Sequence, residues 1–303
     1  MKVSFVITVY NKAAFLPGVI AALKAQTGTF AREYVFVNDG STDTSWDVVQ
    51  SLTSGWDNLV LIDQKNQGVT KATNTGVAAA SGDFIKLVDA DDILAPFCTD
   101  LLLNTLQDSD SDFVFGVSGD YDTEVYFEDP ENPEVVVFDD PLFSVIDRGF
   151  ARVSHCLFKK MLFEAAGGCD ERIFSQDHSL FIRLSSRGRL AQVHHIVCVS
   201  PKDEPGRIMN NEAQVIHDAT IALAYHLDEN VDMSHKQKGA AQKKIILRVW
   251  RWAKKVHGAS FLSAEFALYL LMRCGMTVSP KHLISLCAVF RKNAQVRQPL
   301  KKA

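Results

Sequence analysis

The chain has 303 residues, 47% of them apolar and 22% charged, and a formal net charge of −4. This length and composition allow a large buried core, as one domain or as one domain with an appendage. The sequence excludes a membrane-spanning helix: the apolar run at residues 266–272 is bracketed by Glu265 and Arg273, well short of the ~20 residues that a span needs.

The charge is unevenly distributed along the chain. From Lys236 onward there are fifteen Lys or Arg residues and one acid, Glu265, so this segment carries about +14 and the remainder about −18. An acidic body with a basic tail predicts that the tail meets an anionic surface.

The cysteines and the first residues bear on location. The six cysteines are scattered without metal-binding spacing, which is typical of reduced thiols in a cytosolic protein. The first residues run directly into a strand-like segment and lack the regions of a signal peptide. We therefore expect a cytoplasmic protein.

The first 118 residues alternate between strand-like and helix-like segments. The strand-like runs are residues 3–9, 34–37, 59–62, 84–88 and 113–117, and the helix-like stretches are residues 12–26, 44–54, 69–80 and 96–107. Strands separated by single helices predict parallel crossovers and a sheet covered on both faces. The predicted fold class is α/β, with a mostly parallel sheet flanked by helices.

The pattern changes after residue 118. Residues 119–140 hold two short β-like pieces, 124–127 and 134–138, between Asp-Pro and Asn-Pro turns, which predicts an antiparallel excursion with a solvated acidic face. The segments that follow are helices at 159–166 and 177–187, a strand at 190–199, and helices at 211–227, 237–257, 259–275 and 281–292. We therefore predict a domain over residues 1–210 and a basic helical region over residues 211–303.

The strand at residues 84–88 ends in three carboxylates, Asp89, Asp91 and Asp92. Burying an unpaired carboxylate costs on the order of several kcal/mol, so these side chains predict either open water or a bound cation. Ligands of open α/β sheets bind at the carboxyl ends of the strands. Carboxylates spaced in this way suit Mg²⁺ or Mn²⁺, with phosphate oxygens completing the shell. The alternative is a solvated, Asp-rich cap of the helix near Pro96.

Further motifs accompany this cluster. They are Thr8-Val9-Tyr10-Asn11, Val37-Asn38-Asp39-Gly40-Ser41, Asn66-Gln67-Gly68 with Ala72-Thr73-Asn74, and Gly167-Gly168-Cys169-Asp170 with Gln176-Asp177. In this order, over about 200 residues, the chain resembles the family 2 glycosyltransferases, which are inverting enzymes with the GT-A nucleotide-sugar fold. The resemblance implies a nucleotide-sugar half over residues 1–118 and an acceptor half over residues 119–210.

The resemblance implies how a donor would be bound. Thr8 and Asp39 would hold the nucleotide base, with Asp39 accepting a hydrogen bond from a uracil-like N–H. Asp89 would contact the ribose and, with Asp91, ligate the Mn²⁺ or Mg²⁺ that neutralises the diphosphate leaving group. Read from the residues alone, Asp39 could instead form an Asx turn. Asp92 could either support these ligands or cap the next helix.

Asp177 is the general base that the resemblance implies. In an inverting transfer one carboxylate removes the acceptor hydroxyl proton while that oxygen attacks the anomeric carbon from the opposite face. The family commonly shows Glu-Asp at this point, so Gln176-Asp177 keeps the base and removes a neighbouring charge. The start of a helix, predicted here, favours the anion. Helix capping is an alternative role compatible with catalysis.

Two positions depart from the family pattern. Members often carry an Arg two places after Lys71, where this chain has Thr73. Lys71 is therefore a candidate phosphate ligand, with an ordinary exposed helix lysine as the alternative. The family often has a late Arg or His on a loop that closes over the diphosphate, and Arg207 is the candidate in this chain.

Residues 243–256 interleave lysines and arginines with Trp250 and Trp252. Basic residues beside Trp are typical of a helix at a membrane surface. We expect residues 236–303 to contact an anionic membrane, with docking on the acidic body as the second interpretation and nucleic-acid binding as the third and least favoured.

The sequence thus predicts a metal-dependent inverting glycosyltransferase. It would move a sugar from a nucleotide-diphosphate donor, with UDP favoured, to a hydroxyl of a glycan or lipid-linked saccharide in surface polysaccharide synthesis. The location would be the inner face of the cell membrane. The alternatives are a catalytically degenerate scaffold of the same fold and a sugar-nucleotide nucleotidyltransferase. The latter should have a Gly-rich basic loop that residues 9–13 lack, and the GxGxxG of a dinucleotide oxidoreductase is also missing.

Overall fold

The computed structural model describes residues 1–121, 125–150, 152–202, 211–261, 263–273, 275–292 and 296–297. The strands are β1 (Lys2–Val9), β2 (Ala31–Asp39), β3 (Leu59–Gln64), β4 (Phe84–Asp89), β5 (Ile93–Leu94), β6 (Phe113–Tyr121), β7 (Val135–Val137), β8 (Cys156–Lys159) and β9 (Leu190–Pro201). Within the described residues they form one nine-stranded sheet in the order β3-β2-β1-β4-β8-β6-β9-β5, with β7 paired to β9 beside this path.

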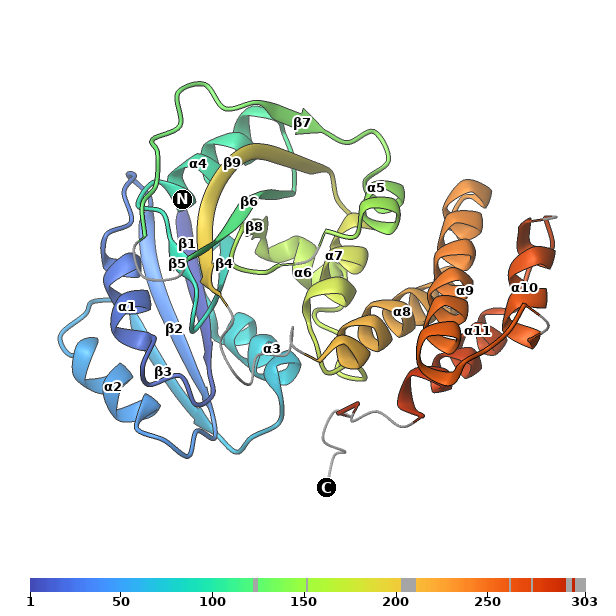
Figure 1. Cartoon of the computed structure of the whole chain (residues 1–303). Helices are drawn as coiled ribbons and strands as arrows, with labels where there is room; N and C mark the ends of the chain where they lie inside the picture. Colours follow the sequence, from blue (N-terminus) through green and yellow to red (C-terminus); the bar gives the residue numbers. More distant parts are fainter. Residues whose placement is uncertain are drawn as a thin grey trace.

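The helices surround this sheet and extend beyond it (Figure 1). They are α1 (Leu16–Lys24), α2 (Ser45–Leu52), α3 (Val69–Ala79), α4 (Cys98–Asp108), α5 (Pro141–Arg148), α6 (Lys160–Ala165), α7 (Asp177–Ser185), α8 (Glu212–Glu229), α9 (His235–His257), α10 (Ala264–Arg273) and α11 (Pro280–Leu286), followed by a 3₁₀ helix (Cys287–Arg291). The α/β prediction is confirmed.

The parallel half of the sheet matches the sequence prediction. Strands β3, β2, β1 and β4 are parallel neighbours, joined through α1, α2 and α3. Because side chains alternate along a strand, Phe5 and Ile7 of β1 pack with α1, α2 and α4 on one face. Val6 faces the other side, in the cluster that contains α3, α7 and the C-terminal helices. The sheet is therefore buried on both faces, as parallel sheets are.

The second half of the sheet region contains elements that the sequence pattern does not predict. Strand β8 lies between β4 and β6 and is antiparallel to both, so the sheet is mixed. Its four residues are too few to show a period. Helix α5 was also missed, although its ends carry ordinary signals: Asp140 Oδ1 accepts the N–H of Phe143 at 3.0 Å, and Gly149 ends the helix with φ 78°.

The expected antiparallel excursion is confirmed in one of its two pieces. Strand β7 is antiparallel to β9, as residues 134–138 predicted. The piece expected at residues 124–127 was wrong over its described residues, 125–127, which form no strand; Tyr126 there is 82% exposed. An isolated extended segment without a pairing partner gains neither ladder hydrogen bonds nor burial.

The C-terminal helices share the core of the sheet. Trp252 of α9 and Phe290 of the 3₁₀ helix belong to the same apolar cluster as Val6 of β1. Trp250 stacks on Tyr269 of α10 with ring centroids 5.4 Å apart. Both tryptophans therefore pack inside the helical region rather than on an exposed basic face. None of the helices in the described part of the chain is long and apolar enough to cross a membrane.

Candidate active site

The carboxyl ends of β1, β2 and β4 place several predicted residues at one edge of the sheet. Thr8 of β1 is in register with Val37 of β2 on one side and with Asp89 of β4 on the other. Asp39 ends β2. Three of the residues expected to bind the donor, Thr8, Asp39 and Asp89, therefore come from neighbouring strands, at the edge where open α/β sheets bind ligands.

The three carboxylates after β4 form a crowded cluster. Asp91 and Asp92 are buried, whereas Asp89 is partly exposed. Desolvation of the carboxylate by the protein packed around it raises the pKa of Asp89 well above its ordinary value, and the negative charges of Asp92, Asp91 and Asp177 raise it further, opposed by Lys12. Asp89 thus retains its proton more readily than a surface aspartate does.

Polar groups from distant parts of the chain support the cluster. Lys12 Nζ lies 2.6 Å from Asp91 Oδ2. Ser200 Oγ of β9 donates to Asp92 Oδ1 at 2.6 Å. Asp92 is therefore held to β9 and does not simply cap a following helix.

This donor set fits a hard divalent cation. Its ligands are all carboxylate oxygens, and a cation would relieve the repulsion that raises the pKa of Asp89. Across the described residues no three His, Cys, Asp or Glu side chains are placed to hold a metal ion by themselves. A site of one or two carboxylates completed by substrate phosphate oxygens is the usual arrangement for Mg²⁺. Asp89 and Asp91 are the residues that would hold the ion.

Asp39 organises the loop that follows β3. Its buried carboxylate, in a residue 3% exposed, accepts hydrogen bonds from Gln64 Nε2 and from the backbone N–H groups of Gln67 and Gly68, each at 2.8 Å. A carboxylate offers about four acceptor positions, so one is left for a ligand. The Asx interaction expected as the alternative belongs instead to Asn38, whose Oδ1 accepts the N–H of Ser41 at 3.1 Å.

Lys71 lies in the first turn of α3, directly after the loop that Asp39 holds, and is partly exposed. The N-terminus of a helix favours anions, so a phosphate ligand at this place is physically sensible. Its role toward the diphosphate stays a prediction. Arg207 lies outside the described residues.

Asp177 is the first residue of α7, and Gln176 occupies the N-cap position. Burial raises the pKa of Asp177 to about 6. A hydrogen bond from Ser175 Oγ at 3.3 Å opposes this shift, while the charges of Asp92 and Asp218 add to it. A carboxylate with a pKa near the working pH is suited to general base catalysis. The fold brings it within electrostatic reach of the acidic cluster.

The two departures from the family pattern meet in one contact. The hydroxyl of Thr73 in α3 donates to Gln176 Oε1, beside Asp177. Asn74 holds the same segment further back, exchanging hydrogen bonds with the backbone of Cys169 at 2.9 and 3.1 Å. An uncharged pair therefore occupies the positions where the family pattern predicts Arg and Glu.

Two residues of the candidate site, Lys12 and Ser175, are not predicted by the sequence. Lys12 follows the first strand, but no sequence spacing indicates its contact with Asp91, which is 79 residues away. Ser175 directly precedes Gln176-Asp177 in the sequence, but a single serine there carries no pattern of its own. Both become visible only when the strand ends converge.

Comparisons with known proteins place the sequence in a family. The model described as glycosyl transferase family 2 matches residues 4–166. The uncharacterised glycosyltransferase alr2836 of Nostoc sp. is 40% identical over 111 residues, 36% of this chain and 34% of its own length. Glycosyltransferase GlyG of Streptococcus pneumoniae is 31% identical over 121 residues, 40% of each chain. The chain thus matches about a third to two fifths of the length of these relatives.

Solved structures share the fold over nearly the whole chain. S. aureus TarS 1–349 in complex with UDP-GlcNAc has a TM-score of 0.68 at 15% identity, covering 90% of this chain and 79% of TarS 1–349. The mannosyltransferase PcManGT of Pyrobaculum calidifontis, in complex with GDP-Man and Mn²⁺, has a TM-score of 0.64 at 16% identity, covering 95% of this chain and 84% of its own. At such identities the likeness shows the GT-A fold alone.

Proposed function

This chain belongs to glycosyl transferase family 2, and on that premise we propose that it is a metal-dependent inverting enzyme that uses a nucleotide-diphosphate sugar. One observation carries the proposal most: Asp177, a partly exposed carboxylate whose pKa is raised to about 6 by desolvation, lies within electrostatic reach of Asp89 and Asp92 at the donor edge of the sheet. A base and an acidic donor site are thus combined in one place.

The donor would lie across the ends of β1, β2 and β4. Thr8 and the fourth acceptor position of Asp39 would contact the base, and UDP is favoured because a carboxylate accepts the N–H of uracil. A divalent cation held by Asp89 and Asp91 would neutralise the charge that develops on the diphosphate. TarS with UDP-GlcNAc and PcManGT with GDP-Man and Mn²⁺ support a donor of this class without fixing its base.

Asp177 would remove the proton from the acceptor hydroxyl. Its ionised form accepts that proton while the oxygen forms the new bond to the anomeric carbon and the bond to the diphosphate breaks. The acceptor oxygen and the leaving group lie on opposite faces of the sugar, so the configuration inverts. Ser175 would steady the carboxylate through its hydroxyl.

The acceptor is proposed to be a glycan or lipid-linked saccharide of a surface polysaccharide, reached at the inner face of the cell membrane. Helix α10, at the outer end of the helical region in Figure 1, supports this location. Phe261, Leu270 and Met276 at or beside α10 are 63%, 46% and 52% exposed. Lys254 Nζ lies 5.1 Å from the Phe261 ring centroid. Exposed apolar side chains beside a basic helix fit an anionic lipid surface.

Only some of the basic residues of α9 are available to the proposed lipid surface, because others contact the acidic body. Lys244 Nζ donates to the carbonyls of Ile146 and Asp147 at the end of α5, at 2.6 and 2.8 Å, and Lys255 pairs with Glu212 at 2.6 Å. Some of the tail's charge therefore docks on the acidic body. Flotation with vesicles containing anionic phospholipid should recover the wild type but not L270E, and equal recovery of both would reject α10 as the contact.

The donor site is tested by calorimetric titration with UDP, GDP, CDP and dTDP, with and without Mn²⁺. We expect Mn²⁺-dependent binding of one nucleotide, most strongly UDP. Failure of all four to bind would reject the proposed donor site. Binding that is equally tight without Mn²⁺ would reject its metal dependence.

A further inference from the structure

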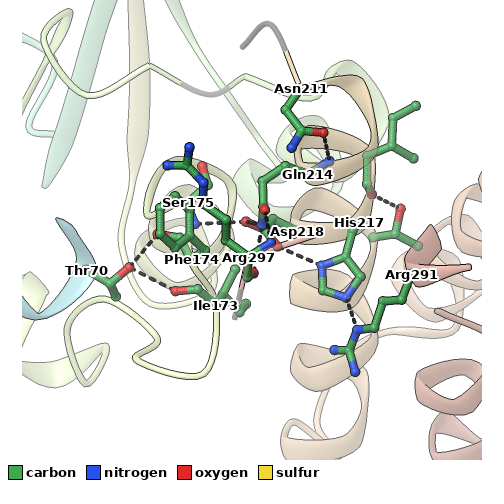
Figure 2. Close-up of polar contacts among 12 residues, drawn as sticks. Thr70, Ile173, Phe174, Ser175, Asn211, Gln214, His217, Asp218, Arg291 and Arg297 are labelled. Atoms are coloured by element: carbon green, nitrogen blue, oxygen red, sulfur yellow. Dashed lines mark hydrogen bonds and ion pairs between the residues drawn. The ribbon is translucent and has the colours of Figure 1, made fainter. Parts of the chain in front are cut away.

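A chain of hydrogen bonds joins the C-terminal helices to the segment that carries Asp177 (Figure 2). Asp218 of α8 stands at its centre and is 2% exposed. Its Oδ2 accepts the backbone N–H of Ser175 at 2.9 Å and Gln214 Nε2 at 2.8 Å, and its Oδ1 lies 2.7 Å from His217 Nδ1. Because a buried carboxylate that loses a partner is costly, these three contacts fix its position.

Arg291, the last residue of the 3₁₀ helix, sets the tautomer of His217. Arg291 Nε donates to His217 Nε2 at 3.1 Å. A guanidinium can only donate, so Nε2 accepts and Nδ1 carries the hydrogen that is donated to Asp218. The imidazole is thereby oriented from one side by Arg291 and from the other by Asp218.

Ser175 connects this chain to the proposed base. Its backbone N–H is held by Asp218, and its hydroxyl donates to Asp177 Oδ1 at 3.3 Å. From the opposite side, the hydroxyl of Thr70 in α3 donates to the carbonyls of residues 173 and 174, at 2.9 and 3.1 Å. The segment before Asp177 is therefore held between α3 of the sheet region and α8 of the helical region.

The end of the described chain adds a second attachment. The backbone N–H of Arg297 donates to Gln214 Oε1 at 2.6 Å, and its guanidinium carbon lies 5.6 Å from the ring centroid of Phe174. Gln214 thus contacts both Asp218 and the C-terminal segment. The side chains that support the base's segment come from α8, the 3₁₀ helix and residue 297, far from the family's motifs in sequence.

We propose that Asp218, oriented by His217 and Arg291, is a positioning residue that holds Asp177 in place through Ser175. The basic C-terminal region is then part of what makes proton removal efficient, in addition to any surface it docks on. This inference rests on the proposed function of Asp177 as the base.

The test compares D218N with D228N in the full chain. Asp228 lies on the same helix and is exposed, so D228N is a matched control. An Asn at position 218 cannot accept all three hydrogen bonds, because half of its amide is a donor. Amide exchange of residues 173–177 should become faster in D218N alone. Hydrolysis of UDP-GlcNAc with Mn²⁺ should slow by roughly tenfold to a hundredfold. UDP affinity should stay within about twofold.

The pH profile of hydrolysis separates positioning from a general loss of structure. Asp177 is faced by Asp89 and Asp92 from the end of β4 and by Asp218 from α8. Removing the charge of Asp218 should move the acid limb to lower pH. S175A keeps the backbone N–H but removes the hydroxyl that opposes the shift, so it should move the limb to higher pH.

Several results would overturn the inference. The inference fails if D218N matches D228N in both the amide exchange of residues 173–177 and the rate of hydrolysis. It also fails if D218N loses UDP affinity by the same factor as it loses hydrolysis. If D218N does not fold, R291Q takes its place, and unchanged exchange at residues 173–177 would be decisive against the proposal. If no hydrolysis of UDP-GlcNAc is detected, the amide exchange of residues 173–177 alone decides whether the inference stands. Full activity of D177N would instead reject Asp177 as the base while leaving the exchange result standing.

Discussion

Lowering the pH from 7 to 5 should slow sugar transfer by up to about tenfold, because Asp177, the proposed base, can accept a proton only as a carboxylate. Burial raises its pKa to about 6. With that midpoint, the ionised fraction falls from about 0.9 at pH 7 to about 0.1 at pH 5. An ordinary aspartate, with a pKa of about 3.9, would stay more than about 0.9 ionised over the same range.

The assay is the initial rate at saturating donor and Mn²⁺ across this pH range. A cation bound at Asp89 would draw the midpoint somewhat lower, whereas burial, the largest cause of the shift, does not depend on the cation. D92N removes one of the charges that raise the pKa, so its acid limb should lie at lower pH than that of the wild type. A rate that is constant between pH 7 and 5 in the wild type would refute the reasoning.

Three further predictions follow from the same site. D91N should weaken donor binding in the presence of Mn²⁺ by more than about tenfold, and calorimetry showing unchanged affinity would remove Asp91 from the metal site. Because the pKa of Asp89 is raised in the folded state, this group contributes stability to the metal-free protein below pH ~4, and that contribution is lost as the pH rises through the folded pKa. Denaturant unfolding should therefore show that Mn²⁺ stabilises the protein more at pH 7.5 than at pH 5; equal stabilisation at the two pH values would contradict this. T73R should lower the melting temperature by placing an uncompensated charge beside Gln176, and Q176E in the same chain should restore much of it; additive losses would show that the two positions do not couple.

The parts of the fold that the sequence predicted are those with local signals. The parallel strands alternate with helices of readable period, and the run of carboxylates at the end of β4 is contiguous in the sequence. Strand β8 is four residues long and gains its stability from pairing with β4 and β6, so no local pattern marks it. The packing of Trp250 against α10 and the burial of Trp252 in the core depend on tertiary contacts, which a helix considered alone does not reveal.

The candidate site shows the same division. Asp89, Asp91 and Asp177 could be proposed from the sequence because they stand in motifs, whereas Lys12 and Asp218, which support them, come from segments without one. Asp218 reaches Ser175 across 43 residues of sequence, so only the packing of α8 against α7 creates the contact. Contacts of this kind follow from the tertiary structure, and residue patterns cannot supply them.

The most direct test of the central claim is a comparison of D177N with the wild type, measuring both donor affinity and turnover with Mn²⁺. The proposed mechanism predicts donor affinity within about twofold of the wild type, because Asp177 contacts the acceptor and not the nucleotide, and turnover reduced by roughly a hundredfold to ten-thousandfold. Turnover close to that of the wild type, or an equal loss of affinity and turnover, would contradict the assignment of Asp177 as the base.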